Sequence, residues 1–211
     1  MSVERVQKHS YSGELRIPVS GDYHLQLPEE RGTRVPLVLF LHGMYEADRI
    51  FELVSPPAKA RAGELAAAVL SPLSGDTRWS VDFVVGLLDH VCATRPIDPS
   101  RIYATGTSIG GLATWEIALR RPSQFAALVP ICGAGQPWNA FRIAHVPVWA
   151  FHGALDEVVP ASVSEEMVQA LRSSGGNPRL TIYSDGRHDV WSRAYSDPSL
   201  WEWLFAQQLA A

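Results

Sequence analysis

The chain has 211 residues, of which 46% are hydrophobic and 19% charged, and its formal net charge is −4 at pH 7. This length suits one α/β domain, and we expect a single domain over residues 1–211. The mild negative charge and the absence of any basic run longer than Arg120-Arg121 argue against a nucleic-acid partner. No apolar stretch approaches the roughly 18 residues of a membrane span, so no membrane partner is expected either.

The two cysteines and the first residues favour a cytoplasmic location. Residues 1–8 lack the hydrophobic segment of a secretory signal. Cys92 falls in a helical pattern and Cys132 at the end of a buried run, so both are interpreted as small core residues rather than a disulfide.

The pattern of the first 30 residues predicts an antiparallel hairpin. Residues 14–19 and 23–28 alternate with period two, and Ser20-Gly21-Asp22 between them are turn formers. We expect this hairpin at an edge of the sheet.

From residue 36 onward the pattern changes to continuous apolar runs, which are typical of parallel strands covered on both faces. Helical patterns alternate with these runs, and the Ser162–Glu165 pair predicts a capping box for one helix. Asp197-Pro198 predicts the start of a closing helix. The runs that predict strands lie at 36–41, 65–70, 101–105, 125–131, 146–151 and 179–183. This alternation predicts a doubly wound, mostly parallel α/β sheet, whose ligands bind outside the carboxyl ends of the strands.

A Gly-x-Ser-x-Gly motif, Gly106 to Gly110, joins the strand at 101–105 to a helix over 112–121. In this strand–turn–helix context Ser108 is a candidate nucleophile held on a strained turn. Glycines two residues to either side leave room for that turn, because a Cβ there would collide with it. The alternative is a Gly-rich turn without a chemical role.

His188 is the candidate general base, since a serine hydroxyl near neutral pH needs one within hydrogen-bond reach. On such sheets the order along the chain is serine, acid, then histidine, and His188 lies beyond Ser108 in a loop after the last strand. The other histidines fit less well: His9 and His24 come too early, His90 is within a helix, His145 precedes a strand, and His42 and His152 occupy His-Gly corners typical of structural histidines.

Asp156, at the exit of the 146–151 strand, is the candidate acid that orients His188. Its neighbour Glu157 is expected to point elsewhere, and Asp185 and Asp189 flank His188 too closely to orient its ring. His152 and Asp156 alone are a weak metal signal, so neither a metal nor a cofactor is predicted.

Two backbone N–H groups are the candidate donors to the oxyanion of a tetrahedral intermediate. One is the N–H of Ile109, directly after the nucleophile. The other belongs to Met44, in the loop after the 36–41 strand. Tyr45, Trp138 and Trp191 are candidates for the walls of the substrate pocket. For Trp138 and Trp191, packing in the core or at the rim is an equally open alternative.

With these residues in place, the chain resembles the α/β-hydrolase superfamily from about residue 12 to 207. It is most similar to compact bacterial esterases of the dienelactone-hydrolase and phospholipase/carboxylesterase-like group, which includes feruloyl-esterase-like members. The similar stretches are 41–43, 98–103, 106–111, 130–133, 151–160, 186–191 and 195–198. The resemblance implies Ser108, Asp156 and His188 as a catalytic triad, and it places Met44 and Ile109 at the oxyanion donors. Dienelactone hydrolases proper use a cysteine nucleophile, from which Ser108 departs.

These residues predict a serine carboxylesterase acting on short or aryl acyl esters, with a small-molecule ester as its partner. Residues 133–145 leave no room for a large cap, which favours substrates of modest size. A serine peptidase or acyltransferase on the same fold is the first alternative, and a non-catalytic binding module is the second. The oligomeric state is not predicted.

Overall fold

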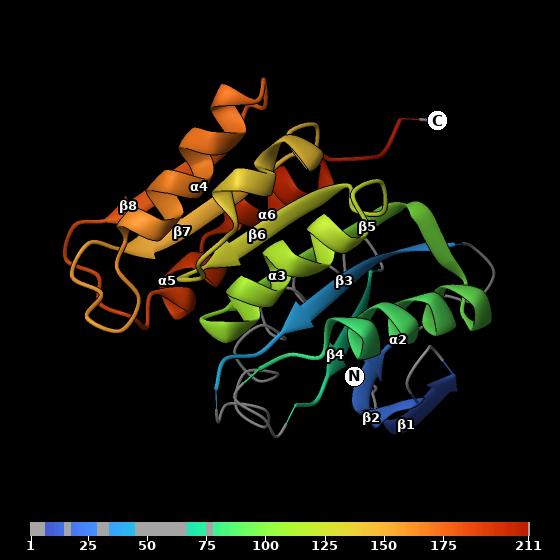
Figure 1. Ribbon diagram of the computed structural model, residues 1–211. Coiled ribbons are helices and arrows are strands. Elements are labelled where there is room, and N and C mark those ends of the chain that lie inside the picture. The colour runs from blue at the N-terminus through green and yellow to red at the C-terminus, as the bar shows by residue number, and fades with distance from the viewer. Residues whose placement is uncertain (1–6, 15–17, 29–33, 45–66, 75–77, 211) are drawn as a thin grey trace.

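The computed structural model describes residues 7–14, 18–28, 34–44, 67–74 and 78–210 (Figure 1). Its strands form one sheet in the order β1-β2-β4-β3-β5-β6-β7-β8. Strands β3 to β8 run parallel, whereas β1 and β2 pair antiparallel at one edge. The strands are β1 Gln7–Glu14, β2 Pro18–Gln26, β3 Val35–Leu41, β4 Ala68–Pro72, β5 Ile97–Thr107, β6 Ala127–Ile131, β7 Trp149–Gly153 and β8 Arg179–Tyr183.

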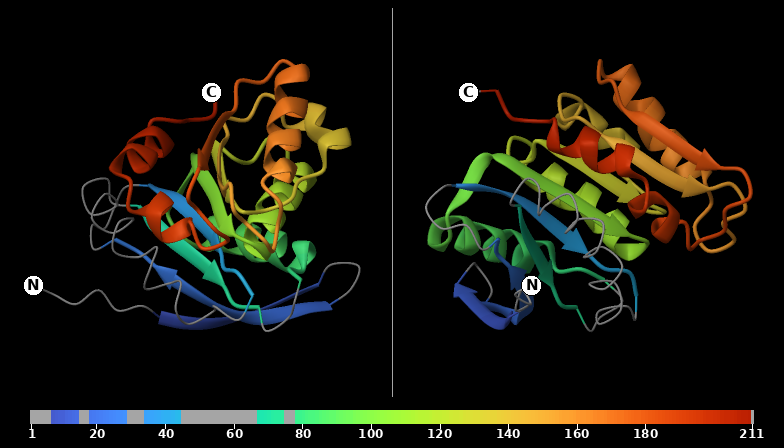
Figure 2. Two further views of the ribbon diagram at one scale, coloured as in Figure 1. Left: turned by 90° about the vertical axis from the view of Figure 1, so that its left-hand side faces the viewer. Right: turned by 180° about the vertical axis from the view of Figure 1, so that it is seen from behind.

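Helices cover both faces of the sheet, which confirms the doubly wound α/β architecture. Helices α2, α3 and α4 lie on one face, and α5 and α6 lie on the other (Figure 2). The helices are α2 Val81–Thr94, α3 Ile109–Arg120, α4 Ser162–Ser173, α5 Trp191–Tyr195 and α6 Pro198–Phe205. Between β6 and β7, residues 132–148 contain one short 3₁₀ helix, η1 Pro137–Arg142, so this connection carries no large cap.

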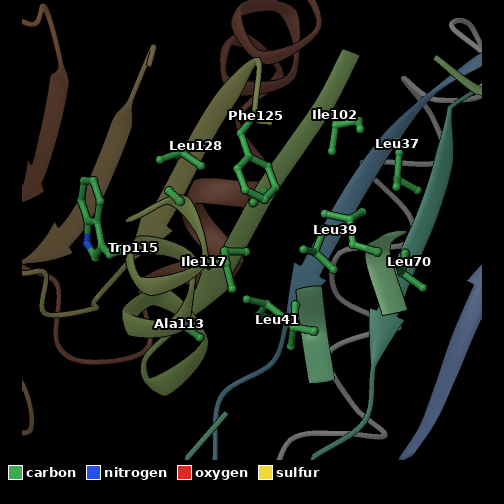
Figure 3. Close-up of a cluster of buried hydrophobic side chains, with 14 of the residues drawn as sticks. Leu37, Leu39, Leu41, Leu70, Ile102, Ala113, Trp115, Ile117, Phe125 and Leu128 are labelled. Carbon is green, nitrogen blue, oxygen red and sulfur yellow. The ribbon is translucent and has the colours of Figure 1, made fainter. Parts of the chain in front are cut away.

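Alternate residues of each central strand feed two separate hydrophobic clusters. On β3, Leu37, Leu39 and Leu41 point into the larger cluster, which packs against α2, α3 and α4 (Figure 3). Val38 and Phe40 point into the smaller cluster under α5 and α6. Because both faces are buried, the strand is apolar at every position, which is why its sequence shows no alternation.

The N-terminal hairpin lies at the predicted edge, but its strands are displaced from the prediction. Ser20-Gly21-Asp22, expected as the turn, lie within β2, and Gly21 pairs with Tyr11 of β1. A Cβ on Gly21 would sit 2.7 Å from the ring of Phe83 on α2. This glycine therefore allows a helix to approach the strand closely, rather than forming a turn.

The predicted capping box at the start of α4 is wrong. The N-cap residue is Ala161, in the αR conformation, and it makes no side-chain capping bond. Backbone bonds from Val163 to Pro160 and from Ser164 to Ala161 already form a turn before Ser162, so Ser162 is inside the helix. The predicted cap of α6 is confirmed, because the Asp197 side chain accepts a hydrogen bond from the Ser199 N–H.

Candidate active site

Ser108 lies in a strained turn between β5 and α3. Its φ of 54° and ψ of −117° are rarely adopted by residues with a side chain, as the motif predicted. The turn is held by a hydrogen bond from the Ser108 N–H to the carbonyl of Ile131 on the neighbouring strand β6. A Cβ on Gly110 would overlap the backbone carbonyl of Leu41, and one on Gly106 would overlap Gly110 itself. These two glycines therefore let β3, β5 and α3 meet at van der Waals distance.

The structure brings the three predicted catalytic side chains together from three segments of the chain. His188 Nε2 lies 2.9 Å from Ser108 Oγ, and His188 Nδ1 lies 2.7 Å from Asp156 Oδ2. The side chain of His188 is 20% exposed, whereas that of Asp156 is fully buried. Solvent therefore reaches the histidine, while the carboxylate is shielded from water.

The hydrogen-bond partners fix the tautomer of His188. A carboxylate only accepts hydrogen bonds, so Nδ1 carries the hydrogen and Nε2 presents a lone pair to the Ser108 hydroxyl. In this arrangement the imidazole can remove the hydroxyl proton, and the carboxylate stabilises the imidazolium that forms.

Asp156 is held in its ionised form by hydrogen bonds. Burial alone would raise the pKa of this carboxyl, but hydrogen bonds from His188 and from the N–H groups of Val159 and Val158 lower the pKa below its ordinary value of 3.8. The two backbone donors lie 2.8 and 2.9 Å from Oδ1. The sequence reasoning missed them, although an aspartate two and three residues before these N–H groups is the signal of a local Asx-type turn.

The loop that contains Met44 is anchored by His42. The ring Nδ1 of His42 donates to the carbonyl of Gly43 at 2.7 Å, and Nε2 accepts the N–H of Ser74 at 3.0 Å. Trp79 packs edge-on against the ring and donates to the His42 carbonyl. His42 is thus a structural histidine, as predicted, and it fixes the backbone immediately before Met44.

The two predicted oxyanion donors come from different segments of the chain. Ile109 is the first residue of α3, so its N–H has no acceptor within the helix. Met44 follows β3 and is 37% exposed. The carboxyl end of β3 lies beside that of β5, with Leu41 paired to Gly106.

The predicted pocket residues have different surroundings. Trp191 is buried and meets the His188 ring edge-on, with the centroids 5.6 Å apart. Trp138, on η1, is 74% exposed. Tyr45 lies outside the described residues.

The remaining acidic neighbours behave as expected for surface groups. Glu157 points away from the site and lies 3.4 Å from the guanidinium of Arg187. Asp185 pairs with Arg193 at the surface. His145 is not part of this site, since its Nε2 forms a hydrogen bond with the carbonyl of Pro122.

One buried group has the side chains to hold a metal ion. The ligand atoms of Cys132, His152 and Asp156 lie within 4.8 Å of one another. Cys132 is therefore a third possible metal ligand beside the two that the sequence offered. Asp156 Oδ2 already accepts from His188, and a metal on that oxygen would compete with the triad. Burial raises the pKa of the Cys132 thiol to about 12, which disfavours the thiolate that a metal requires.

Among the helices that the structure describes, none is both long and apolar enough to span a bilayer.

Comparisons with known proteins show the family of this chain. The profile of the dienelactone hydrolase family matches residues 72–197, more than half of the chain. A bifunctional acetylxylan esterase/xylanase of Neocallimastix patriciarum is 24% identical over 196 residues, covering 80% of this chain and 28% of that protein.

Solved structures extend the likeness to nearly the whole chain. A thermostable esterase is 29% identical, with a TM-score of 0.83, and the match covers 95% of this chain and 63% of the esterase. An S-formylglutathione hydrolase from Staphylococcus aureus, 15% identical with a TM-score of 0.75, shares the fold over 95% of this chain and 99% of its own. The chain spans less than two thirds of the xylan-degrading enzyme and of the thermostable esterase.

Proposed function

This chain belongs to the dienelactone hydrolase family of α/β hydrolases, and from that premise we propose that it is a serine carboxylesterase with Ser108 as its nucleophile. One observation carries the proposal: a serine at φ 54° lies 2.9 Å from a histidine whose other nitrogen lies 2.7 Å from a buried carboxylate. The esterase names of the relatives support the same chemistry.

The reaction begins with attack of Ser108 Oγ on the ester carbonyl carbon. His188 Nε2 takes the hydroxyl proton, and Asp156 stabilises the resulting imidazolium. The carbonyl oxygen becomes an oxyanion, which the N–H groups of Ile109 and Met44 stabilise. The intermediate collapses when His188 returns the proton to the leaving alkoxide, which leaves an alcohol and an acyl-enzyme.

Water completes the cycle through the same groups. His188 removes a proton from a water molecule, whose oxygen attacks the acyl carbonyl. The second tetrahedral intermediate then expels Ser108 Oγ, which recovers its proton from His188. The products are one carboxylic acid and one alcohol per ester, and no cofactor takes part.

Short or aryl acyl esters are the proposed substrate class. The β6–β7 connection, residues 132–148, adds a single 3₁₀ helix and no large cap, which favours substrates of modest size. Trp191, edge-on to His188, offers an apolar wall beside the reacting atoms, and Tyr45 and Trp138 remain proposed pocket residues.

Turnover of p-nitrophenyl acetate and butyrate tests the proposal. We expect wild-type hydrolysis, and a loss of about a thousandfold or more in Ser108→Ala because the nucleophile is gone. Ser173→Ala, an exposed serine on α4, is the matched control and should match wild type. A fluorophosphonate probe should label wild type and Ser173→Ala but not Ser108→Ala. Absence of wild-type turnover, or equal turnover in Ser108→Ala, would refute the assignment, and faster cleavage of anilides than of esters would favour a peptidase.

A further inference from the structure

A second histidine lies against the carboxylate of Asp156, in contact with the same oxygen that accepts from His188. His152, at the end of β7, is completely buried. Its Nε2 lies 3.1 Å from Asp156 Oδ2 and 2.9 Å from the carbonyl oxygen of Val159, and its Nδ1 lies 2.7 Å from Ser164 Oγ on α4. A continuous series of polar contacts thus runs from α4 to the nucleophile.

The partners of His152 determine where its hydrogens lie. Nε2 faces two groups that can only accept, the Asp156 carboxylate and the Val159 carbonyl, so it carries a hydrogen, which it donates to Val159. The hydroxyl of Ser164 can satisfy Nδ1 by donating to it. Ser164 and Val159 therefore favour the same tautomer of His152, the one with its hydrogen on Nε2.

This N–H reaches Asp156 through Val159. The Val159 carbonyl accepts the Nε2–H of His152, and the N–H groups of Val158 and Val159 donate to Asp156 Oδ1. Oδ2 accepts from His188 at 2.7 Å, and the His152 ring contacts the same oxygen at 3.1 Å. Because the side chain is fully buried, these neighbours set its orientation, and that orientation directs Oδ2 at His188.

We propose that His152 is a positioning residue for the triad: its Nε2–H holds the Val159 carbonyl, and so the turn whose N–H groups orient Asp156 towards His188, and Ser164 holds His152 in the required tautomer. The catalytic meaning of this assignment rests on the proposed function. The only other ionisable side chain in this cluster is Cys132, among the residues that the structure describes, and burial keeps its thiol neutral. His152 touches no reacting atom, so it acts through Asp156.

Two replacements of His152 separate this role from simple packing. In His152→Gln the amide nitrogen can occupy the position of Nε2 and donate to the Val159 carbonyl. In His152→Asn the amide reaches only the position of Nδ1, so it keeps the contact with Ser164 and loses the one with Val159. Both changes remove the ring, and Asn leaves the larger cavity, so the melting temperature of each variant is measured beside kcat. A purely structural role predicts a lower melting temperature with kcat and the His188 environment unchanged.

The activity readout is hydrolysis of p-nitrophenyl acetate. We expect kcat to fall about tenfold to a hundredfold in His152→Asn, because a small misplacement of a catalytic group has effects of that size, and to stay within about fivefold of wild type in His152→Gln. KM should change little in either, since His152 does not contact substrate. Tyr103→Phe is the control: it deletes a hydrogen bond to the carbonyl of Gln207, so it should lower the melting temperature without lowering kcat.

Proton NMR provides a readout that does not depend on turnover. The His188 Nδ1–H, bonded to a buried carboxylate, gives a downfield resonance that should persist in His152→Gln and should shift or broaden in His152→Asn. Equal kcat values and equal resonances in the two variants would overturn the proposal. If wild type shows no ester hydrolysis, the proposed function fails, and the NMR comparison still decides the role of His152.

Ser164→Ala leaves the His152 ring in place, so it tests the proposal even if both replacements of His152 unfold the protein. We expect a smaller displacement of the His188 resonance, because Val159 still favours the same tautomer. A resonance identical to that of wild type in Ser164→Ala would contradict the part assigned to that serine.

Discussion

Replacement of Asp156 by asparagine is the sharpest test of the proposed triad, because it changes one carboxylate oxygen to an NH₂ group at nearly constant shape. The amide oxygen can still accept the N–H groups of Val158 and Val159 at the Oδ1 position. The NH₂ group then faces His188 Nδ1 from 2.7 Å and His152 Nε2 from 3.1 Å. Two donors cannot share one hydrogen bond, so His188 must present a lone pair at Nδ1 and carry its hydrogen on Nε2.

The consequence for catalysis can be stated as a magnitude. A hydrogen on Nε2 points at Ser108 Oγ, and the imidazole can no longer accept the hydroxyl proton. We expect kcat to fall about 10⁴-fold, as in a triad whose acid is amidated. At about 1.4 kcal/mol per factor of ten, this corresponds to about 5.5 kcal/mol of transition-state stabilisation. KM should change little, because the buried carboxylate does not reach substrate.

Steady-state hydrolysis of p-nitrophenyl acetate by Asp156→Asn measures this loss. Asp185→Asn is the matched control, since Asp185 also flanks His188 in sequence but pairs with Arg193 at the surface, and it should behave as wild type. A loss of less than about tenfold in Asp156→Asn, with the fold intact, would refute the tautomer argument. An equal loss in Asp185→Asn would show that general loop disturbance, not the acid, is responsible.

Two further predictions concern stability. The Thr105 hydroxyl donates to the Val129 carbonyl, so it accepts from the buried hydroxyl of Tyr195 at 2.8 Å. Thr105→Val removes this acceptor, so urea unfolding should show a loss of about 1–3 kcal/mol, larger than that of Tyr195→Phe; an equal or smaller loss would contradict this hydrogen-bond direction. For Asp98, burial raises the pKa, but hydrogen bonds from Ser100 and Arg101 outweigh it and the pKa lies below its ordinary value of 3.8. Its stabilisation is therefore complete above that value and is lost as the pH falls below it. The difference in unfolding free energy between wild type and Asp98→Asn should be constant from about pH 5 to about pH 7 and should shrink towards about pH 3. A constant difference over this whole range would contradict the prediction.

The sequence predicted which segments form strands better than the limits of those strands. The last strand, 179–183, was predicted with its observed bounds because polar residues and a helix stop frame it. The run at 146–151 enters the sheet only at Trp149, since Pro147 has no N–H and Val148 makes a single isolated bridge. The strand limits of the hairpin were predicted wrongly, because a glycine such as Gly21 gives the same sequence signal whether it forms a turn or makes room for Phe83.

The candidate site was predictable where it follows from topology. Ser108, Asp156 and His188 each follow a parallel strand, and those strand ends share one edge of the sheet, so chain order sufficed to select them. The contact of His152 with Asp156 was not predictable in this way. His152 was assigned a structural role, and only the turn over 153–156 brings its ring back to the carboxylate.

The two glycines around Ser108 have a consequence for how the nucleophile could change. The turn is fixed by backbone atoms of Leu41, Gly110 and Ile131, none of which depends on the side chain at position 108. The identity of the nucleophilic atom is therefore independent of the scaffold that presents it, so a hydroxyl or a thiol could occupy the same point. The frame of the turn, rather than the serine, is the part of this site least open to substitution.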